Sequence, residues 1–253
     1  MALRLDNEAA WLLEARPYRE TSLLVEVLTA RHGRLGLVAQ GARGGSRGQS
    51  LRRALLEPFR PLRLSAAGAG ELLTLATVEA DGVPQRPVGD RLFAALYVNE
   101  LVQRLTGRGD PVPELFRRYR DWLAELARLP ATPPAALAWS LRRFERDLLA
   151  LAGYALVLAH DEDGVALDPA ADYAFDPDQG ARAWSPASPW PRVRGEVLLA
   201  WAGDRQPAPA QLSALRALSR RVIGHRLDGA PLRSLRLAAQ WRLQPGGGED
   251  PGD

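Results

Sequence analysis

Residues 16–43 read RPYRETSLLVEVLTARHGRLGLVAQGAR, and this stretch decides the fold of the first part of the chain. Residues 22–29 (SLLVEVLT) and 35–39 (LGLVA) are rich in aliphatic and β-branched side chains, which favours two strands. His32-Gly33-Arg34 lies between them, and glycine reaches the backbone conformations that tight turns need. The stretch therefore predicts a β-hairpin.

Further strand candidates surround this hairpin: a weak alternation over residues 10–15, broken by Arg16-Pro17, and apolar runs over 62–65 and 72–78. Five short strands in a segment of this size are typical of a small barrel or sandwich, and a five-stranded OB-type barrel fits the length best. The turn-rich DGVPQRPVG at residues 81–89 marks a boundary. We therefore predict an OB-fold domain over residues 1–82.

Beyond that boundary the apolar residues recur at helical spacing. This pattern predicts helices over residues 92–105, 113–129, 133–152, 194–202, 210–226 and 235–243, and a single helical turn over 51–56 in the first domain. The acidic tract at about 160–191 holds five prolines and is expected to be irregular or to form a short hairpin near 173–184. The fold class is thus α+β, with the barrel followed by a mostly α-helical domain over residues 83–245 and a disordered tail over 246–253.

The charge of the chain is unevenly distributed. All 33 basic residues are arginine, and the formal net charge is only +3. Residues 31–63 hold eight arginines and one acid, whereas residues 161–192 hold seven acids and two arginines. Arginine stays protonated near neutral pH and presents a planar fork of donors that suits phosphate.

The basic segment of residues 41–53, GARGGSRGQSLRR, is a poor core element and a good phosphate-facing surface. It has no acid to compensate its charge, and its glycines permit close approach of a backbone. We predict nucleic-acid contacts, to DNA or RNA, at Arg43, Arg47, Arg52 and Arg53, with Tyr18 and Phe59 as candidate platforms for stacked bases. The alternatives are a solvated basic face without a ligand and two aromatic residues that belong to the core.

A second candidate site lies in the predicted helix over 133–152, at LRRFERDLL. Arg142, Arg143 and Leu148 could form a groove with an apolar floor and an arginine rim, which suits an acidic peptide that ends in hydrophobic residues. In the alternative, one arginine pairs with Glu145 or Asp147 and has a structural role.

Several classes of function are not expected. The chain has no cysteine, which excludes disulfides and Cys-ligated zinc, and its three histidines lie far apart. We find no phosphate-binding Walker pattern and no nucleophile motif, so we expect a protein that is not an enzyme, with no cofactor and no metal. The absence of a long apolar run or a signal peptide predicts a cytoplasmic protein. If it binds DNA as the basic segment suggests, we expect it to be nucleoid-associated.

The motifs of the chain also resemble those of a known family. RPYRETSLL, HGRLGLVAQGAR, LLEPFRPL, GELLTL, LYVNEL, LRRFERDLLALAGY and LDGAPLRSLRL occur in the order in which they occur in the RecO family of bacterial DNA repair and recombination mediators. The resemblance spans nearly the whole chain. It implies an OB-fold followed by a helical domain that acts in the RecF pathway of recombinational DNA repair.

The resemblance further implies binding of single- and double-stranded DNA, annealing of complementary strands, and action with RecR and the C-terminal tail of single-strand-binding protein to help load RecA. Carried over by motif, Arg34 and Arg43 are DNA contacts, and Arg142 and Arg143 lie in the tail-binding helix. Two alternatives stay open: an adaptor for single-strand-binding protein whose DNA binding is incidental, and an OB-fold RNA-binding factor. Two departures from the family are Gln40, where lysine is common, and the cysteine-free tract where many members carry a four-cysteine zinc site.

Overall fold

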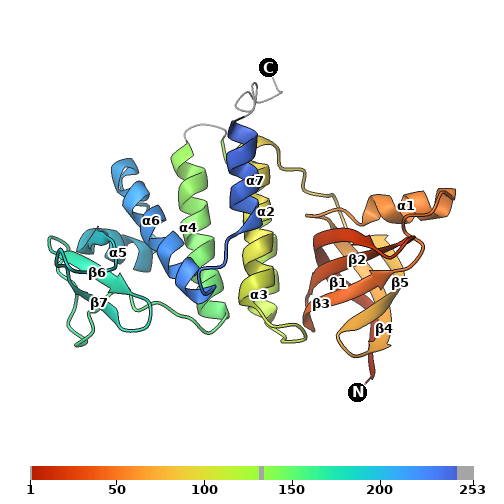
Figure 1. Ribbon diagram of the computed structural model, residues 1–253, viewed down its shortest axis with the longest axis horizontal. Coiled ribbons are helices and arrows are strands. Elements are labelled where there is room, and N and C mark those ends of the chain that lie inside the picture. The colour runs from red at the N-terminus through yellow and green to blue at the C-terminus, as the bar shows by residue number, and fades with distance from the viewer. Residues whose placement is uncertain (1, 131–133, 244–253) are drawn as a thin grey trace. The chain divides into compact units, whose positions relative to one another are not determined.

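A computed structural model describes residues 2–130 and 134–243. Five strands come first: β1 (Ala2–Tyr18), β2 (Ser22–Thr29), β3 (Gly33–Ala39), β4 (Pro61–Ala69) and β5 (Leu72–Ala80). They close into a barrel in the order β1-β2-β3-β5-β4, in which only β3 and β5 run parallel. Figure 1 shows these strands in red to orange. The five-stranded OB-type barrel and the α+β class are confirmed.

The first strand is longer than the sequence predicts. The weak alternation over residues 10–15 and the break at Arg16-Pro17 suggested a short strand, yet β1 extends to Tyr18 and pairs with both β2 and β4. Two register shifts, between Leu5 and Glu8 and between Leu12 and Glu14, bend the strand around the barrel. Such bulges break the regular alternation of side chains, which explains why the pattern was weak.

The basic segment also contains more helix than expected. Helix α1 spans Arg47–Leu55 rather than a single turn over 51–56. Ser46 explains this difference, because its Oγ accepts a hydrogen bond from the Gln49 backbone N–H at 3.3 Å. The Gln49 side chain accepts in return from the Ser46 N–H at 3.0 Å, which completes a capping box.

Three helices pack with the barrel in one compact unit: α2 (Gly89–Leu105), α3 (Pro113–Arg128) and α7 (Arg233–Arg242). Asn99 in α2 donates a hydrogen bond to the Leu13 carbonyl of β1 at 2.7 Å and accepts one from the Tyr119 hydroxyl at 2.6 Å. Helix α7 lies alongside α2 (Figure 1), where the Phe93 and Trp241 rings are 5.1 Å apart between centroids. Helix α2 therefore contacts the barrel strand β1 as well as helices α3 and α7.

A second compact unit covers residues 128–231. It contains α4 (Pro134–Leu151), β6 (Asp172–Asp176), β7 (Gly180–Ala183), β8 (Arg192–Arg194), α5 (Gly195–Ala202) and α6 (Pro209–Arg226). The acidic tract forms the hairpin β6–β7, with β8 on the other side of β6. Phe175 and Ala181 are fully buried there, and the Trp190 indole N–H donates to the Asp176 carboxylate at 3.1 Å. Of the two alternatives for this tract, the hairpin is the one observed.

The compact units are a different division of the chain from the domains predicted on either side of residue 82. Among the described residues, the first unit comprises 2–127 and 232–243, because α2 and α3 pack on the barrel and α7 returns to α2. The helical part of the chain is thus divided between two units. The predicted tail over 246–253 lies outside the described residues. No helix within residues 2–130 and 134–243 has the length and apolar character needed to cross a membrane.

Candidate nucleic-acid interface

The basic loop, defined here as residues 41–53, is anchored to the barrel at its start. The Arg43 backbone N–H donates to the Thr21 carbonyl at 2.8 Å, and its guanidinium reaches the Arg19 carbonyl at 3.4 Å. Both acceptors belong to the turn between β1 and β2. The loop therefore leaves the barrel beside this turn, with Arg43 exposed.

The other loop arginines fall on α1. Arg47 and Arg53 are exposed, and the first turn of the helix carries no carboxylate. Arg52 is half-buried and donates to the Leu75 carbonyl of β5 at 2.6 Å, so it ties α1 to the barrel. Burial lowers the pKa of Arg52, but a guanidinium remains charged near neutral pH. The structure thus presents Arg43, Arg47 and Arg53 to solvent and uses Arg52 as a tether.

Arg34 is placed differently from the loop arginines. Its side chain is only 12% exposed, and it donates to the Glu26 carboxylate at 3.0 Å and to the Thr106 carbonyl at 2.7 Å. These contacts join β2 and β3 to the end of α2. The Arg34 guanidinium, which was predicted to contact DNA, therefore binds groups within the protein in this structure.

The two aromatic candidates, Phe59 and Tyr18, also differ in how deeply they are buried. Phe59 is 5% exposed and belongs to the core, which is the structural alternative for that residue. Tyr18 is half-buried near the end of β1, and the Arg19 guanidinium lies 5.1 Å from its ring centroid.

Gln40 is exposed where the basic loop begins, so the face at this position is polar and uncharged.

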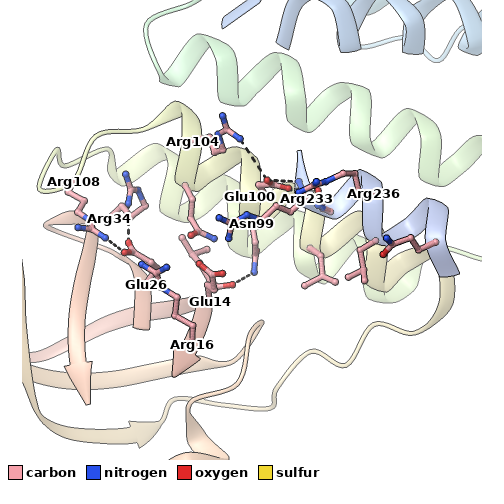
Figure 2. A pocket seen from close by; sticks show the side chains of 16 residues that line it. Glu14, Arg16, Glu26, Arg34, Asn99, Glu100, Arg104, Arg108, Arg233 and Arg236 are labelled. Carbon is pink, nitrogen blue, oxygen red and sulfur yellow. Dashed lines mark hydrogen bonds and ion pairs between the residues drawn. The ribbon is translucent and has the colours of Figure 1, made fainter. Parts of the chain in front are cut away.

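A second basic feature was missed from sequence. A cavity of about 860 Å³ opens between the barrel and the helices α2 and α7 in the first unit (Figure 2). We call it the arginine groove, because its lining includes six arginines: Arg16, Arg34, Arg104, Arg108, Arg233 and Arg236. They come from β1, β3, α2, α7 and the segment after α2. The only local signal was the spacing of Arg233 and Arg236, which places both on one face of a helix.

Three of the groove arginines are engaged by buried or half-buried acids. Glu26 is 5% exposed and pairs with both Arg34 and Arg108. Glu100 lies 4.0 Å from Arg104 and also accepts from the backbone N–H groups of Arg233 and Ser234, each at 2.8 Å. Within the described part of the chain, the side chains of the other three, Arg16, Arg233 and Arg236, have no hydrogen-bond or ion-pair partner. The groove therefore has uncompensated positive charge.

The predicted peptide site on α4 is not assembled as expected. Leu148 is fully buried, so it belongs to the core of the second unit and not to an exposed groove floor. Arg142 is 6% exposed and pairs with the buried Glu145, which also accepts from the Ser219 hydroxyl of α6. The structural alternative with Glu145 as partner is therefore the one observed for Arg142.

Arg143 is the more accessible member of the pair. It donates to the Asp204 carboxylate at 2.9 Å, and Arg146 reaches the same oxygen at 3.1 Å. Burial by itself would raise the pKa of Asp204, but the two guanidinium groups together hold this pKa below its usual range. Arg143 and Arg146 thus share one acid at the end of α5.

The second unit also contains an apolar pocket of about 360 Å³ next to α4. Its lining includes apolar residues such as Ala150, Leu156 and Val157, together with the polar residues Arg146, Asp147 and His160. Arg146 pairs with Asp147 at 2.8 Å. Across the residues that the structure describes, no group of three or more His, Cys, Asp or Glu side chains is arranged to hold a metal ion.

Comparisons with known proteins agree with the geometry. The family model for the N-terminal part of recombination protein O matches residues 2–82, and the model for its C-terminal part matches residues 86–236. A DNA repair protein RecO of Stenotrophomonas maltophilia is 43% identical over 94% of this chain and 98% of its own length. DNA repair proteins RecO of Xanthomonas oryzae pv. oryzae and Xanthomonas campestris pv. campestris are each 44% identical over 91% of this chain, and over 95% and 94% of their own lengths.

Proposed function

Because this chain belongs to the recombination protein O family, we propose that it is a DNA-binding recombination mediator that holds single-stranded DNA on its basic loop and anneals complementary strands. DNA repair is the role of the family, and the basic loop on an OB-type barrel is the observation that supports DNA contact in this chain. We propose no catalytic step.

The mechanism we propose depends on phosphate neutralisation. Arg43, Arg47 and Arg53 are exposed on a short segment without an acid, so each offers its donors to a backbone phosphate. Binding releases condensed counterions and lowers the repulsion between two strands that approach each other. Since these contacts involve the phosphates, the bases remain able to pair with a complementary strand.

A salt titration tests this proposal. Three phosphate contacts to single-stranded DNA predict a log–log slope of affinity against salt of about −2, at about −0.7 for each contact. Changing Arg43, Arg47 and Arg53 together to Ala is expected to flatten this slope and to slow annealing. The same slope in the variant and the unmodified chain would refute the loop as the DNA contact. An equal or higher affinity for RNA of the same sequence would instead favour an RNA-binding factor.

We propose that the protein binds two partners, RecR and the acidic C-terminal tail of single-strand-binding protein. Through them it would help to load RecA onto DNA at the bacterial nucleoid. The apolar pocket beside α4 supports a site for the hydrophobic end of the tail, because Val157 in its lining is 57% exposed and Arg146 lies at the same pocket. This location differs from the groove predicted at Leu148, which is buried.

Binding of a synthetic tail peptide tests the pocket. Val157→Glu places a negative charge in the lining and is expected to weaken the peptide at least tenfold. Val165→Glu is a matched control, because Val165 is 61% exposed in the same unit and does not line the pocket. Equal peptide affinity in both variants would reject this pocket. Repair activity that survives loss of the loop arginines but not Val157→Glu would favour the adaptor function over DNA binding.

A further inference from the structure

We propose that the arginine groove is a second phosphate-binding track, which continues the path of a DNA strand beyond the basic loop. This inference rests on the proposed DNA binding and extends it to a surface formed by β1 and α7. The strand would enter at Arg16 and pass along Arg233 and Arg236 (Figure 2).

The charge balance of the groove supports an anionic ligand. Glu26 and Glu100 are occupied by arginines and by the N-terminus of α7, so they do not neutralise Arg16, Arg233 or Arg236. Glu14 is the remaining acid in the lining. Three guanidinium groups without partners among the described residues thus face one cavity, and arginine forks bind phosphate oxygens well.

The end of β1 and the turn after it link Arg16 of the groove to the start of the basic loop. Arg16 pairs with Leu24 in the β1–β2 ladder, two residues before that ladder ends at Tyr18. The turn that follows supplies the Arg19 and Thr21 carbonyls that hold Arg43. At about 3.3 Å per residue of strand, Arg16 and the turn are separated by roughly 10 Å. A strand bound at Arg43 can therefore reach Arg16 without leaving the protein surface.

The lining indicates contact with the sugar-phosphate backbone. No aromatic residue lines the groove in the part of the chain that the structure describes, so it offers no stacking platform for bases. Leu96 and Leu237 give it an apolar side, and the cavity of about 860 Å³ is far larger than a single phosphate ion requires. An extended strand fits a cavity of this size, because its successive phosphates can contact successive arginines.

Oligonucleotides of two lengths distinguish DNA binding at the groove from DNA binding at the basic loop. A barrel of this type covers about 4–16 nucleotides, so we choose oligo(dT) of about 8 and about 30 nucleotides. The groove variant changes Arg16, Arg233 and Arg236 to Ala, and the loop variant changes Arg43, Arg47 and Arg53 to Ala. A control of equal charge changes Arg86, Arg117 and Arg120, which are exposed in the same unit outside the groove and the loop.

The groove variant is expected to bind the short oligonucleotide as the unmodified chain does. On the long one it is expected to lose about tenfold in affinity, and its salt slope is expected to fall by about 2, for three contacts at about 0.7 each. Suppose that the groove variant binds the long oligonucleotide as tightly as the control does, while the loop variant has reduced affinity for both oligonucleotides. The groove inference is then wrong and the proposed function stands. If the loop variant also binds normally, the proposed function itself fails.

A variant with the opposite expected effect guards against loss of binding by misfolding. Glu14→Gln removes the remaining carboxylate of the lining and is expected to tighten binding of the long oligonucleotide about two- to threefold, without effect on the short one. A misfolded protein would not gain affinity. Unchanged or weaker binding of the long oligonucleotide by Glu14→Gln would count against the track.

Discussion

Glu100 and Ser234 are 134 residues apart in sequence, yet the Glu100 carboxylate accepts hydrogen bonds from both the backbone N–H and the hydroxyl of Ser234, at 2.8 and 2.6 Å. The neighbouring N–H of Arg233 donates to the other carboxylate oxygen. A side chain from α2 thus caps the N-terminus of α7, where backbone donors lack partners within the helix. This cap holds Arg233 and Arg236 beside the barrel.

The cap predicts a measurable cost for Glu100→Ala. Loss of charge-assisted hydrogen bonds to a helix N-terminus is expected to lower the free energy of unfolding by about 2 kcal/mol. Urea denaturation measures the change. Glu114→Ala is the control, since Glu114 pairs with Arg117 at an exposed site and its replacement should cost less than about 1 kcal/mol. Equal effects of the two substitutions would mean that α7 does not depend on Glu100.

The two neighbouring arginines of α4 are expected to differ sharply. Arg142→Ala removes one member of the buried Arg142–Glu145 ion pair, which predicts a loss of about 3–5 kcal/mol in unfolding free energy. Arg143→Ala removes a half-buried contact to Asp204 and is expected to cost about 1 kcal/mol or less. Thermal or urea unfolding of both single variants checks this order. A double variant is unsuitable for testing peptide binding, because unfolding would mimic loss of the site.

Acid is expected to destabilise the second unit through Asp178. Hydrogen bonds from His225 and Arg226 hold the pKa of Asp178 below its usual value. The ionised carboxylate therefore stabilises the folded state above the unfolded pKa of about 3.9, and this contribution is lost as the pH falls through the lower folded pKa. Asp178→Asn is expected to flatten the dependence of the urea midpoint on pH below about pH 4. An acid transition of unchanged steepness would contradict the assignment.

The cap of α1 gives a prediction for the DNA face. Ser46→Ala removes the side-chain acceptor of the capping box and is expected to destabilise the first turn of α1 by about 1 kcal/mol. Because Arg47 begins that turn, we expect faster amide hydrogen exchange there and weaker DNA binding, with global stability almost unchanged. Protection that equals that of the unmodified chain would show that the tether at Arg52 alone orders the helix.

The hairpin of β2 and β3 was predictable because its signals are local: two apolar runs and a glycine turn at Gly33 specify it within a few residues. The limits of β1 were harder to predict, since its bulges depend on pairing with β4. Helix α1 depends on a capping box whose residues also occur in loops. Local pattern therefore predicts the presence of elements better than it predicts their ends.

The exposure of the candidate site residues was predictable only for some of the arginines. Arg43, Arg47 and Arg53 are exposed, and the helix α1 that carries two of them has no buried residue. Arg34 and Arg142 have the same side chain, but their acids, Glu26 and Glu145, meet them through packing that the arginine positions alone do not reveal. Leu148 lies on the apolar stripe of α4, and such a stripe more often faces a core than a ligand.

The return of α7 to α2 has a consequence for biosynthesis. Residues 128–231 form a compact unit of their own, so they emerge from the ribosome between two parts of the first unit. A nascent chain that ends before Leu232 already has the barrel strands and the loop arginines, but it lacks Arg233 and Arg236. Among the features formed by the described residues, the arginine groove is therefore completed last, and its presence distinguishes a chain translated through α7 from one that ends before it.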